Sequence, residues 1–207
     1  MSINSYFCVK KETENEMIIE RSRFISYVKP CRTEEEARAF IEEKRKAHPF
    51  ATHNCYAYIV ERGSVARFSD DGEPQGTAGQ PILEVIKNKK LCDTAVVVTR
   101  YFGGIKLGAG GLVRAYSQGA KEVIDKSGTV ENVLSSVYFI EMNYDLYSVF
   151  LKISDKTKCS VISTDFEDLV KIKVAVPISD GNFPLEILDK TNGKVEPKKI
   201  GEDFIVY

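Results

Sequence analysis

Arg100-Tyr101-Phe102-Gly103-Gly104-Ile105-Lys106-Leu107-Gly108-Ala109-Gly110-Gly111-Leu112-Val113-Arg114 is the stretch of sequence that decides how the first half of the chain folds. The residues before it, 94–99, have an unbroken apolar middle, which predicts a buried strand. The residues from Gly110 to Lys126 predict a helix that ends at Gly128. A strand therefore enters a loop that holds five glycines, and a helix leaves it.

This glycine-rich loop has the composition of an anion-binding turn. Glycine allows positive φ and lets a ligand approach the backbone closely. The free N–H groups at the start of a helix carry partial positive charge and attract anions. We therefore expect phosphate or another anion here, bound by the five glycines and three basic side chains of the loop: Gly103, Gly104, Gly108, Gly110, Gly111, Arg100, Lys106 and Arg114.

A second interpretation of the same loop involves packing alone. The glycines could let helix and strand approach each other, with Arg100 and Arg114 paired to carboxylates. Known nucleotide fingerprints are absent from the loop. Gly108 is followed by Ala109 rather than by Lys-Ser or Lys-Thr, which excludes a P-loop, and Val113 occupies the place of the third glycine of GxGxxG.

An acidic loop, residues 67–81, is the second candidate element. Its three carboxylates, Asp70, Asp71 and Glu73, lie within four residues, beside Arg67 and near Thr77 at a predicted helix start. Asp70 and Asp71 could bind a divalent cation, hold basic side chains (Arg67, Arg100 or Lys106), or cap the turn through hydrogen bonds to backbone. We favour the ion-pair and turn role and expect no metal site and no cofactor, because acidic loops more often satisfy backbone groups than ligate ions. An EF-hand is excluded, since its alternating acidic positions and closing glutamate are missing.

His53-Asn54-Cys55 is the remaining chemical candidate. A thiolate paired with an imidazole would be a nucleophile. However, His53 and Cys55 are two residues apart at a strand start, and no third orienting group is evident. We therefore expect Cys55 to be a packed strand cysteine and His53 to lie at the rim of the ligand site, and we favour binding over catalysis.

The rest of the chain predicts an α+β protein with two domains, residues 1–132 and 133–207. In the first, hydrophobic periodicity and turn residues predict a hairpin or bent strand pair at 16–28, a helix from Thr33 to Lys46, a strand pair at 54–60 and 64–68, and a helix from Gly79. In the second, the predicted strands are 137–143, 159–165, 168–176 and 203–207, and the predicted helices are 144–154 and 181–191. That order, βαββαβ, is typical of a ferredoxin-like fold.

Charge and composition limit the kinds of partner that the whole protein could attract. Lys and Arg number 29 and Asp and Glu 30, so the net charge of −1 gives no whole-protein attraction to nucleic acid or to an anionic membrane. The longest apolar runs, such as residues 95–98, are too short to span a bilayer, and residues 1–7 lack the features of a signal peptide. A cytoplasmic protein without membrane contact is expected. The five scattered cysteines contain no CxxC pair, which argues against both disulfides and structural zinc.

Three segments together resemble a known family. They are Ala51-Thr52-His53-Asn54-Cys55-Tyr56-Ala57-Tyr58, residues 67–79 with Arg67-Phe68-Ser69-Asp70-Asp71-Gly72-Glu73-Pro74, and residues 97–108 with Thr99-Arg100-Tyr101-Phe102-Gly103-Gly104. They are similar to the signature of the YigZ/IMPACT family. The resemblance implies a ribosomal protein S5 domain 2-like fold followed by a ferredoxin-like domain, as in stand-alone bacterial members. It also implies a link to translation, because eukaryotic members are translation regulators that act through protein contacts.

Three functions remain open. The first is a binding module for RNA or the ribosome, in which Lys87, Lys89 and Lys90 would add charge and Tyr101 and Phe102 would stack on bases. The second is an enzyme acting on a phosphorylated small molecule, with Asp70 or Asp71 as base or metal ligand. The third is a pure protein-interaction module for a translation-related protein. We favour the binding module, since no complete catalytic set can be assembled from the residues present.

Overall fold

The computed structural model describes residues 4–207, and its chain divides into two compact units. One unit consists of residues 6–130, and the other of residues 131–207 with Asn4 and Ser5. The division falls inside a single long strand, β7 (Thr129–Met142). Both units combine helices with antiparallel sheets, which confirms the predicted α+β class.

The unit of residues 6–130 is built on a five-stranded sheet with the order β2-β3-β6-β4-β5. Its strands are β2 (Thr13–Ile19), β3 (Ser22–Pro30), β4 (His53–Val60), β5 (Val65–Ser69) and β6 (Thr94–Tyr101). All neighbours pair antiparallel, and β6 lies in the centre. The order leaves β5 as an edge strand beside β4, with its other side unpaired within the sheet.

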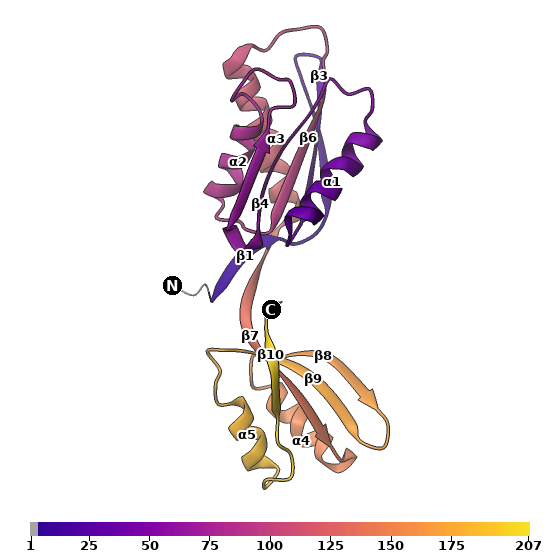
Figure 1. Ribbon diagram of the computed structural model, residues 1–207, viewed down its shortest axis with the longest axis vertical. Coiled ribbons are helices and arrows are strands. Elements are labelled where there is room, and N and C mark those ends of the chain that lie inside the picture. Colours follow the sequence, from indigo (N-terminus) through magenta and orange to yellow (C-terminus); the bar gives the residue numbers. More distant parts are fainter. Residues whose placement is uncertain (1–3) are drawn as a thin grey trace. The chain divides into compact units, whose positions relative to one another are not determined.

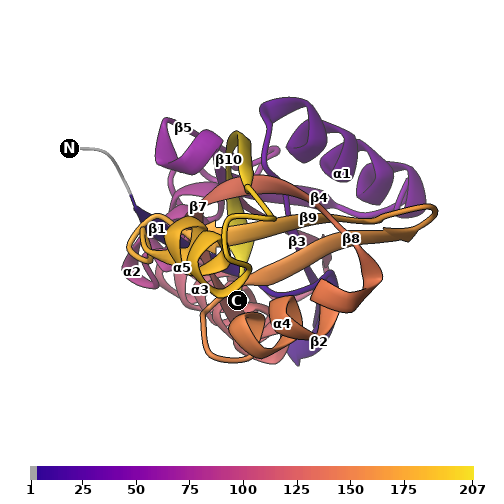
Figure 2. The same cartoon turned by 90° about the horizontal axis from the view of Figure 1, so that it is seen from below.

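Three helices cover both faces of this sheet. Helix α1 (Glu34–Ala47) packs on one face, and α2 (Gly79–Asn88) and α3 (Gly108–Ser127) pack on the other, as Figures 1 and 2 show. Side chains alternate between the faces of a strand. Val96 and Val98 therefore enter the core under α2 and α3, whereas Ala95 and Val97 enter the core under α1. Burial on both faces explains the unbroken apolar run of β6.

The second sheet has the strand order β1-β7-β9-β8, where β1 is Ser5–Val9, and β10 pairs with β7 outside this path. The other elements of the second unit are α4 (Tyr144–Ser154), β8 (Ser160–Phe166), β9 (Val170–Pro177), α5 (Phe183–Lys190) and β10 (Lys198–Val206). Phe150 of α4 and Ile187 of α5 pack with Ile140 and Ile172 of the central strands. This βαββαβ arrangement confirms the predicted ferredoxin-like topology.

Several predicted boundaries were wrong. Strand β1 was missed, and β7 begins at Thr129 instead of residue 137, because the polar residues at 131–132 interrupt its apolar pattern. Strand β10 begins at Lys198 rather than Asp203. Helix α3 begins at Gly108 rather than Gly110, so three of the loop glycines (Gly108, Gly110 and Gly111) belong to its first turn. By contrast, the Thr33 cap is confirmed, since its hydroxyl accepts a hydrogen bond from the amide of Glu36 at 3.2 Å.

Candidate functional site

Asp70 caps the start of helix α2. Its carboxylate accepts hydrogen bonds from the amides of Gly76 at 2.8 Å, Ala78 at 3.0 Å and Gly79 at 2.8 Å. A carboxylate at this position satisfies free N–H groups and complements the helix dipole. Gly79 is required for this arrangement, because a Cβ atom there would lie 2.5 Å from the carbonyl oxygen of Ser69. The turn role predicted for Asp70 is confirmed.

Asp71 joins three neighbouring segments. It has a positive φ of 44°, and its carboxylate accepts hydrogen bonds from the Asn54 amide at 2.6 Å and from Arg45 at 2.9 Å. Its backbone carbonyl lies 2.8 Å from His53 Nδ1. A carbonyl can only accept, so Nδ1 carries the proton and the other ring nitrogen of His53 is left for a different partner. Asp71 thus holds Arg45, rather than Arg67, Arg100 or Lys106 as the sequence suggested.

A buried ion pair connects the acidic turn to the end of strand β6. Glu73 Oε1 lies 2.6 Å from Arg100 Nη1, and the two side chains are only 3% and 5% exposed. Tyr116 of α3 donates a hydrogen bond to the same Glu73 oxygen at 2.7 Å. His53 Nε2 is 3.8 Å from the other oxygen, Oε2. Glu73 is therefore the carboxylate that pairs with Arg100. The packing interpretation of the sequence predicted that Arg100 would pair with a carboxylate but did not identify which one.

The Arg100 guanidinium is fixed from several sides. Its carbon lies 5.3 Å from the centre of the Phe24 ring and 5.4 Å from that of Phe102, and its Nη2 bonds to the Ser22 hydroxyl at 3.3 Å. Within the described residues its Nε has no hydrogen-bond partner. Such a guanidinium between two rings is a rigid support for the exposed face of Phe102.

The start of helix α3 differs from that of α2. Among residues 4–207, no side chain caps it, and its first turn contains no acidic residue. Gly108 has a positive φ of 69° and, with Gly104 and Gly110, would have open space around a Cβ atom. The free amides of this turn and the nearby Lys106 side chain, for which the described residues provide no ion pair, make it an attractive position for an anion.

One cavity of about 420 Å³ brings the two loops together. The acidic loop contributes Glu73 and Pro74, and the glycine-rich loop contributes Lys106 and Gly108. The remaining lining residues are Thr52, His53, Arg100, Phe102, Leu107, Ala109 and Leu112. The lining of the cavity thus combines charged and apolar side chains, and its volume is typical of small-ligand sites.

The structure places the other predicted site residues outside this cavity. Gly103 serves packing, since a Cβ atom there would lie 2.0 Å from the backbone of Arg21, and a Cβ atom at Gly111 would lie 3.0 Å from the Leu107 side chain. Gly104, Gly110 and Arg114 do not line the cavity, nor does Thr77, whose hydroxyl donates to the Pro74 carbonyl at 2.6 Å. These residues therefore lie outside the lining of this cavity, and a role for them in ligand contact stays a prediction.

Arg67 was also wrongly grouped with these loops. It lies opposite Tyr58 in the β4–β5 pair, and Tyr58 belongs to the core under α1. Arg67 therefore faces α1, on the side of the sheet opposite to the cavity. Tyr101 faces the same way, because its hydroxyl contacts His48 Nδ1 at 2.9 Å. Of the two aromatic residues proposed for stacking, only Phe102 lines the cavity.

The chemistry of Cys55 agrees with a packing role. The side chain is buried and its thiol donates to the Asp70 carbonyl at 3.0 Å. Burial, together with nearby carboxylates, raises the pKa of Cys55 well above its usual range, so the nucleophilic thiolate does not form near neutral pH. Burial also raises the pKa of Tyr116, which keeps its hydroxyl protonated as a donor to Glu73. In the described part of the chain, no three His, Cys, Asp or Glu residues gather as a metal site would need.

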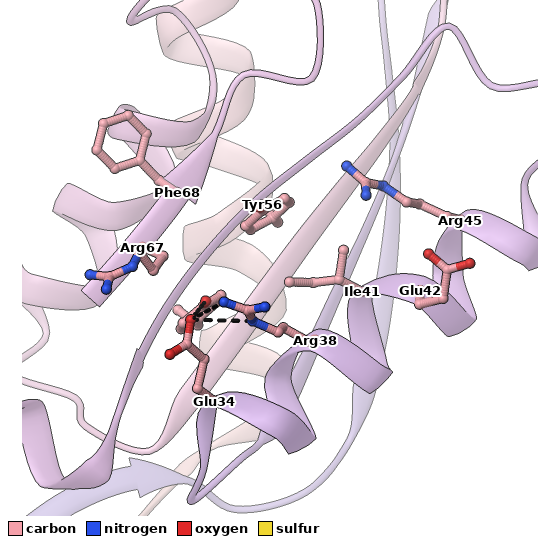
Figure 3. Close-up of a pocket in the computed structure, with 9 residues that line it drawn as sticks. Glu34, Arg38, Ile41, Glu42, Arg45, Tyr56, Arg67 and Phe68 are labelled. Atoms are coloured by element: carbon pink, nitrogen blue, oxygen red, sulfur yellow. Dashed lines mark hydrogen bonds and ion pairs between the residues drawn. The ribbon is translucent and has the colours of Figure 1, made fainter. Parts of the chain in front are cut away.

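A second concave surface, not predicted from the sequence, lies between α1 and the edge strand β5 (Figure 3). It measures about 470 Å³ and contains three arginines, Arg38, Arg45 and Arg67. The signal for it was weak in the sequence, because these arginines are separated by up to 29 positions and each has acidic neighbours in the chain. Only the pairing of β4 with β5 brings Arg67 opposite α1.

Comparisons with known proteins agree with this architecture. Residues 20–124 match the Impact N-terminal domain. The chain is 40% identical to "IMPACT family member YvyE" of Bacillus subtilis over 199 residues, covering 95% of this chain and 92% of the relative. It is 32% identical to "IMPACT family member YigZ" of Escherichia coli, covering 89% of this chain and 92% of that protein. A solved structure titled "Crystal structure of an hypothetical protein" is similar with a TM-score of 0.65 and 30% identity, covering 98% of this chain and all of that one.

Within residues 4–207, none of the helices has the length and apolar character that crossing a bilayer requires. The cavity, the buried Glu73–Arg100 pair and the capped α2 all lie inside the segment that matches the Impact N-terminal domain. The resemblance of the sequence to the YigZ/IMPACT family is confirmed by the match over most of the chain. The chain belongs to the IMPACT family.

Proposed function

We propose that the protein is a translation-associated binding module that takes an RNA phosphate into the cavity between the acidic and glycine-rich loops. The contrast between the two helix starts carries this proposal. Helix α2 has a built-in anion, the Asp70 carboxylate, on its free amides. Helix α3 has none within the described residues, and its first turn opens on a cavity beside Lys106. A phosphate oxygen at α3 would complete the equivalent arrangement.

The apolar lining residues of the cavity support a nucleic-acid ligand over a bare anion. The Phe102 ring is 45% exposed and lines the cavity with Pro74 and Leu112. An exposed ring beside a cationic side chain is the combination that binds a base and its phosphate. The association with translation rests on family membership, because the resemblance identifies eukaryotic members as translation regulators.

Salt-dependent binding of RNA tests the proposal. The assay is fluorescence anisotropy with a labelled single-stranded RNA, and the variant is Lys106→Glu. Removing a phosphate contact should weaken binding roughly tenfold and reduce the slope of log K against log salt by about 1. Lys121→Glu is the matched control, since Lys121 lies on α3, outside the cavity, and is exposed. Binding that ignores salt, or an equal loss in both variants, would contradict the proposal.

One observation favours a second function, catalysis on a phosphorylated small molecule. His53 has its Nδ1 proton held by the Asp71 carbonyl, while Nε2 lies near Glu73 in a cavity of small-ligand size. The base would then be His53 and not Asp70 or Asp71, whose carboxylates already accept backbone hydrogen bonds. A thermal-shift screen of nucleotides and sugar phosphates tests this function. Stabilisation by one compound, lost in His53→Ala together with its turnover, would support it.

A further inference from the structure

The groove between α1 and β5 lies on the face of the sheet opposite to the cavity. Figure 3 shows its walls: Arg38 and Arg45 project from α1, and Arg67 and Phe68 from β5, with Tyr56 between them. The other lining residues are Glu34, Ile41, Glu42 and Tyr58. Of these charged side chains, three are positive and two negative, so the groove has a net positive charge in a protein whose total is −1.

The three arginines present guanidinium groups with spare donors. Arg67 is exposed, and the hydrogen bond found for its side chain goes to the adjacent Ala66 carbonyl at 3.0 Å. Arg45 shares one bond with Asp71 at 2.9 Å and keeps 39% of its side chain exposed. Arg38 pairs with Glu34 and is 71% exposed. Each guanidinium has five N–H donors, so all three retain donors for an anion.

Aromatic rings form the floor. Tyr56 and Tyr58 are stacked with a centroid distance of 6.1 Å and an interplanar angle of 6°. The Arg45 guanidinium carbon lies 5.7 Å from the centre of the Tyr56 ring, and Figure 3 shows Arg67 on the other side of that ring. Tyr58 is held by its hydrogen bond to Glu34 at 2.8 Å. The Tyr56 ring therefore lies beside the guanidinium of Arg45 on one wall, and Arg67 belongs to the facing wall (Figure 3).

We propose that this groove is a second ligand site and that its ligand is a nucleotide, with the phosphate on Arg67 and Arg45 and the base against Tyr56. Guanidinium forks match phosphate oxygens in a bidentate way, and tyrosine rings stack on bases of any sequence. The volume of about 470 Å³ suits one nucleotide unit. The unit can be a free nucleotide or one residue of an RNA chain. The site is independent of the cavity proposed above, because the two lie on opposite faces of the sheet.

The test is a titration of the full chain with four probes: adenosine 5′-monophosphate, ribose 5-phosphate, octaglutamate and a twelve-residue oligoadenylate. Binding is followed by NMR shifts of the backbone amides of Tyr56 and Arg67, two residues that line this groove and not the cavity. Arg67→Ala should weaken binding of the monophosphate and the oligoadenylate roughly 5- to 100-fold. Tyr56→Leu should do the same for those two probes but leave ribose 5-phosphate unchanged, whereas Tyr56→Phe should keep wild-type affinity.

Matched controls separate this site from the cavity. Arg114→Ala removes an exposed arginine from α3 and should leave the groove titration unchanged. Arg67→Ala should leave the Lys106-dependent component of RNA binding in place, so failure of one site is distinguishable from failure of the other. If only the oligoadenylate shows the Arg67 and Tyr56 dependence, the ligand is a nucleotide within an RNA chain. Unchanged affinity in Arg67→Ala, or octaglutamate binding as tightly as the monophosphate, would overturn the proposal.

Discussion

Breaking the buried pair between Glu73 and Arg100 is the sharpest test of how the candidate site is held together. The two side chains are 3% and 5% exposed and 2.6 Å apart, so each single substitution leaves a charge buried without its partner. Removing one partner of such a pair costs about 3–5 kcal/mol in the free energy of unfolding. That is a large part of the about 5–15 kcal/mol that holds a typical domain folded. We therefore expect Glu73→Leu and Arg100→Met each to lower stability by several kcal/mol.

The double variant makes the experiment decisive. When both charges are removed, no uncompensated charge remains in the interior, so the double variant should lose clearly less than the sum of the two single losses. The coupling free energy should exceed about 1 kcal/mol. Urea denaturation at pH 7, followed by circular dichroism, gives the four unfolding free energies. Strictly additive losses, with coupling below about 0.5 kcal/mol, would refute the reasoning, because they would mean that each charge is independently solvated.

Three further predictions concern the surrounding structure. Asp70→Ala removes the cap of α2 and should lower the unfolding free energy by about 1–2 kcal/mol, measured by urea denaturation. Gly79→Ala should lower the unfolding free energy by about 1–3 kcal/mol, since the added Cβ would lie 2.5 Å from the Ser69 carbonyl oxygen. Gly110→Ala has open space at its Cβ and should stabilise α3 by up to about 1 kcal/mol. A lower melting temperature in Gly110→Ala would contradict this prediction. Burial lowers the pKa of His48 below its usual 6.5, so the folded state binds a proton less readily than the unfolded chain. The unfolding free energy should therefore decline as pH falls below 6.5. This decline should be smaller in His48→Gln when unfolding is compared at about pH 7.5 and about pH 5.5.

The elements that the sequence predicted well are those with strong local patterns. The apolar run at residues 95–98 predicted the central strand β6, and Thr33 followed by three glutamates predicted the start of α1. These signals depend on neighbours within one element and need no knowledge of pairing. Strands with polar interruptions, such as the first residues of β7, gave no such signal, because their burial depends on which partner strand covers them.

The candidate site was predictable in position but not in its partners. Both loops were identified, yet the partner of Arg100 is Glu73, 27 positions away, and this pairing follows from the fold of the acidic turn. Arg67 illustrates the opposite error. Closeness in sequence to Asp70 suggested a shared site, but strand alternation places its side chain on the α1 face. Glycines were overinterpreted for a related reason, since composition does not distinguish Gly103, needed for packing, from Gly108, which lines the cavity.

The position of Asp71 has a practical consequence for anyone who dissects this protein by mutation. Its carbonyl orients His53 on one face of the sheet, and its carboxylate holds Arg45 on the other. A substitution there would change the behaviour of both faces at once, whichever of them a given ligand occupies. Substitutions of Asp71 will therefore reduce binding in almost any screen. Only substitutions confined to one face of the sheet, such as those of Lys106 and Arg67, can show which of the two faces binds a given ligand.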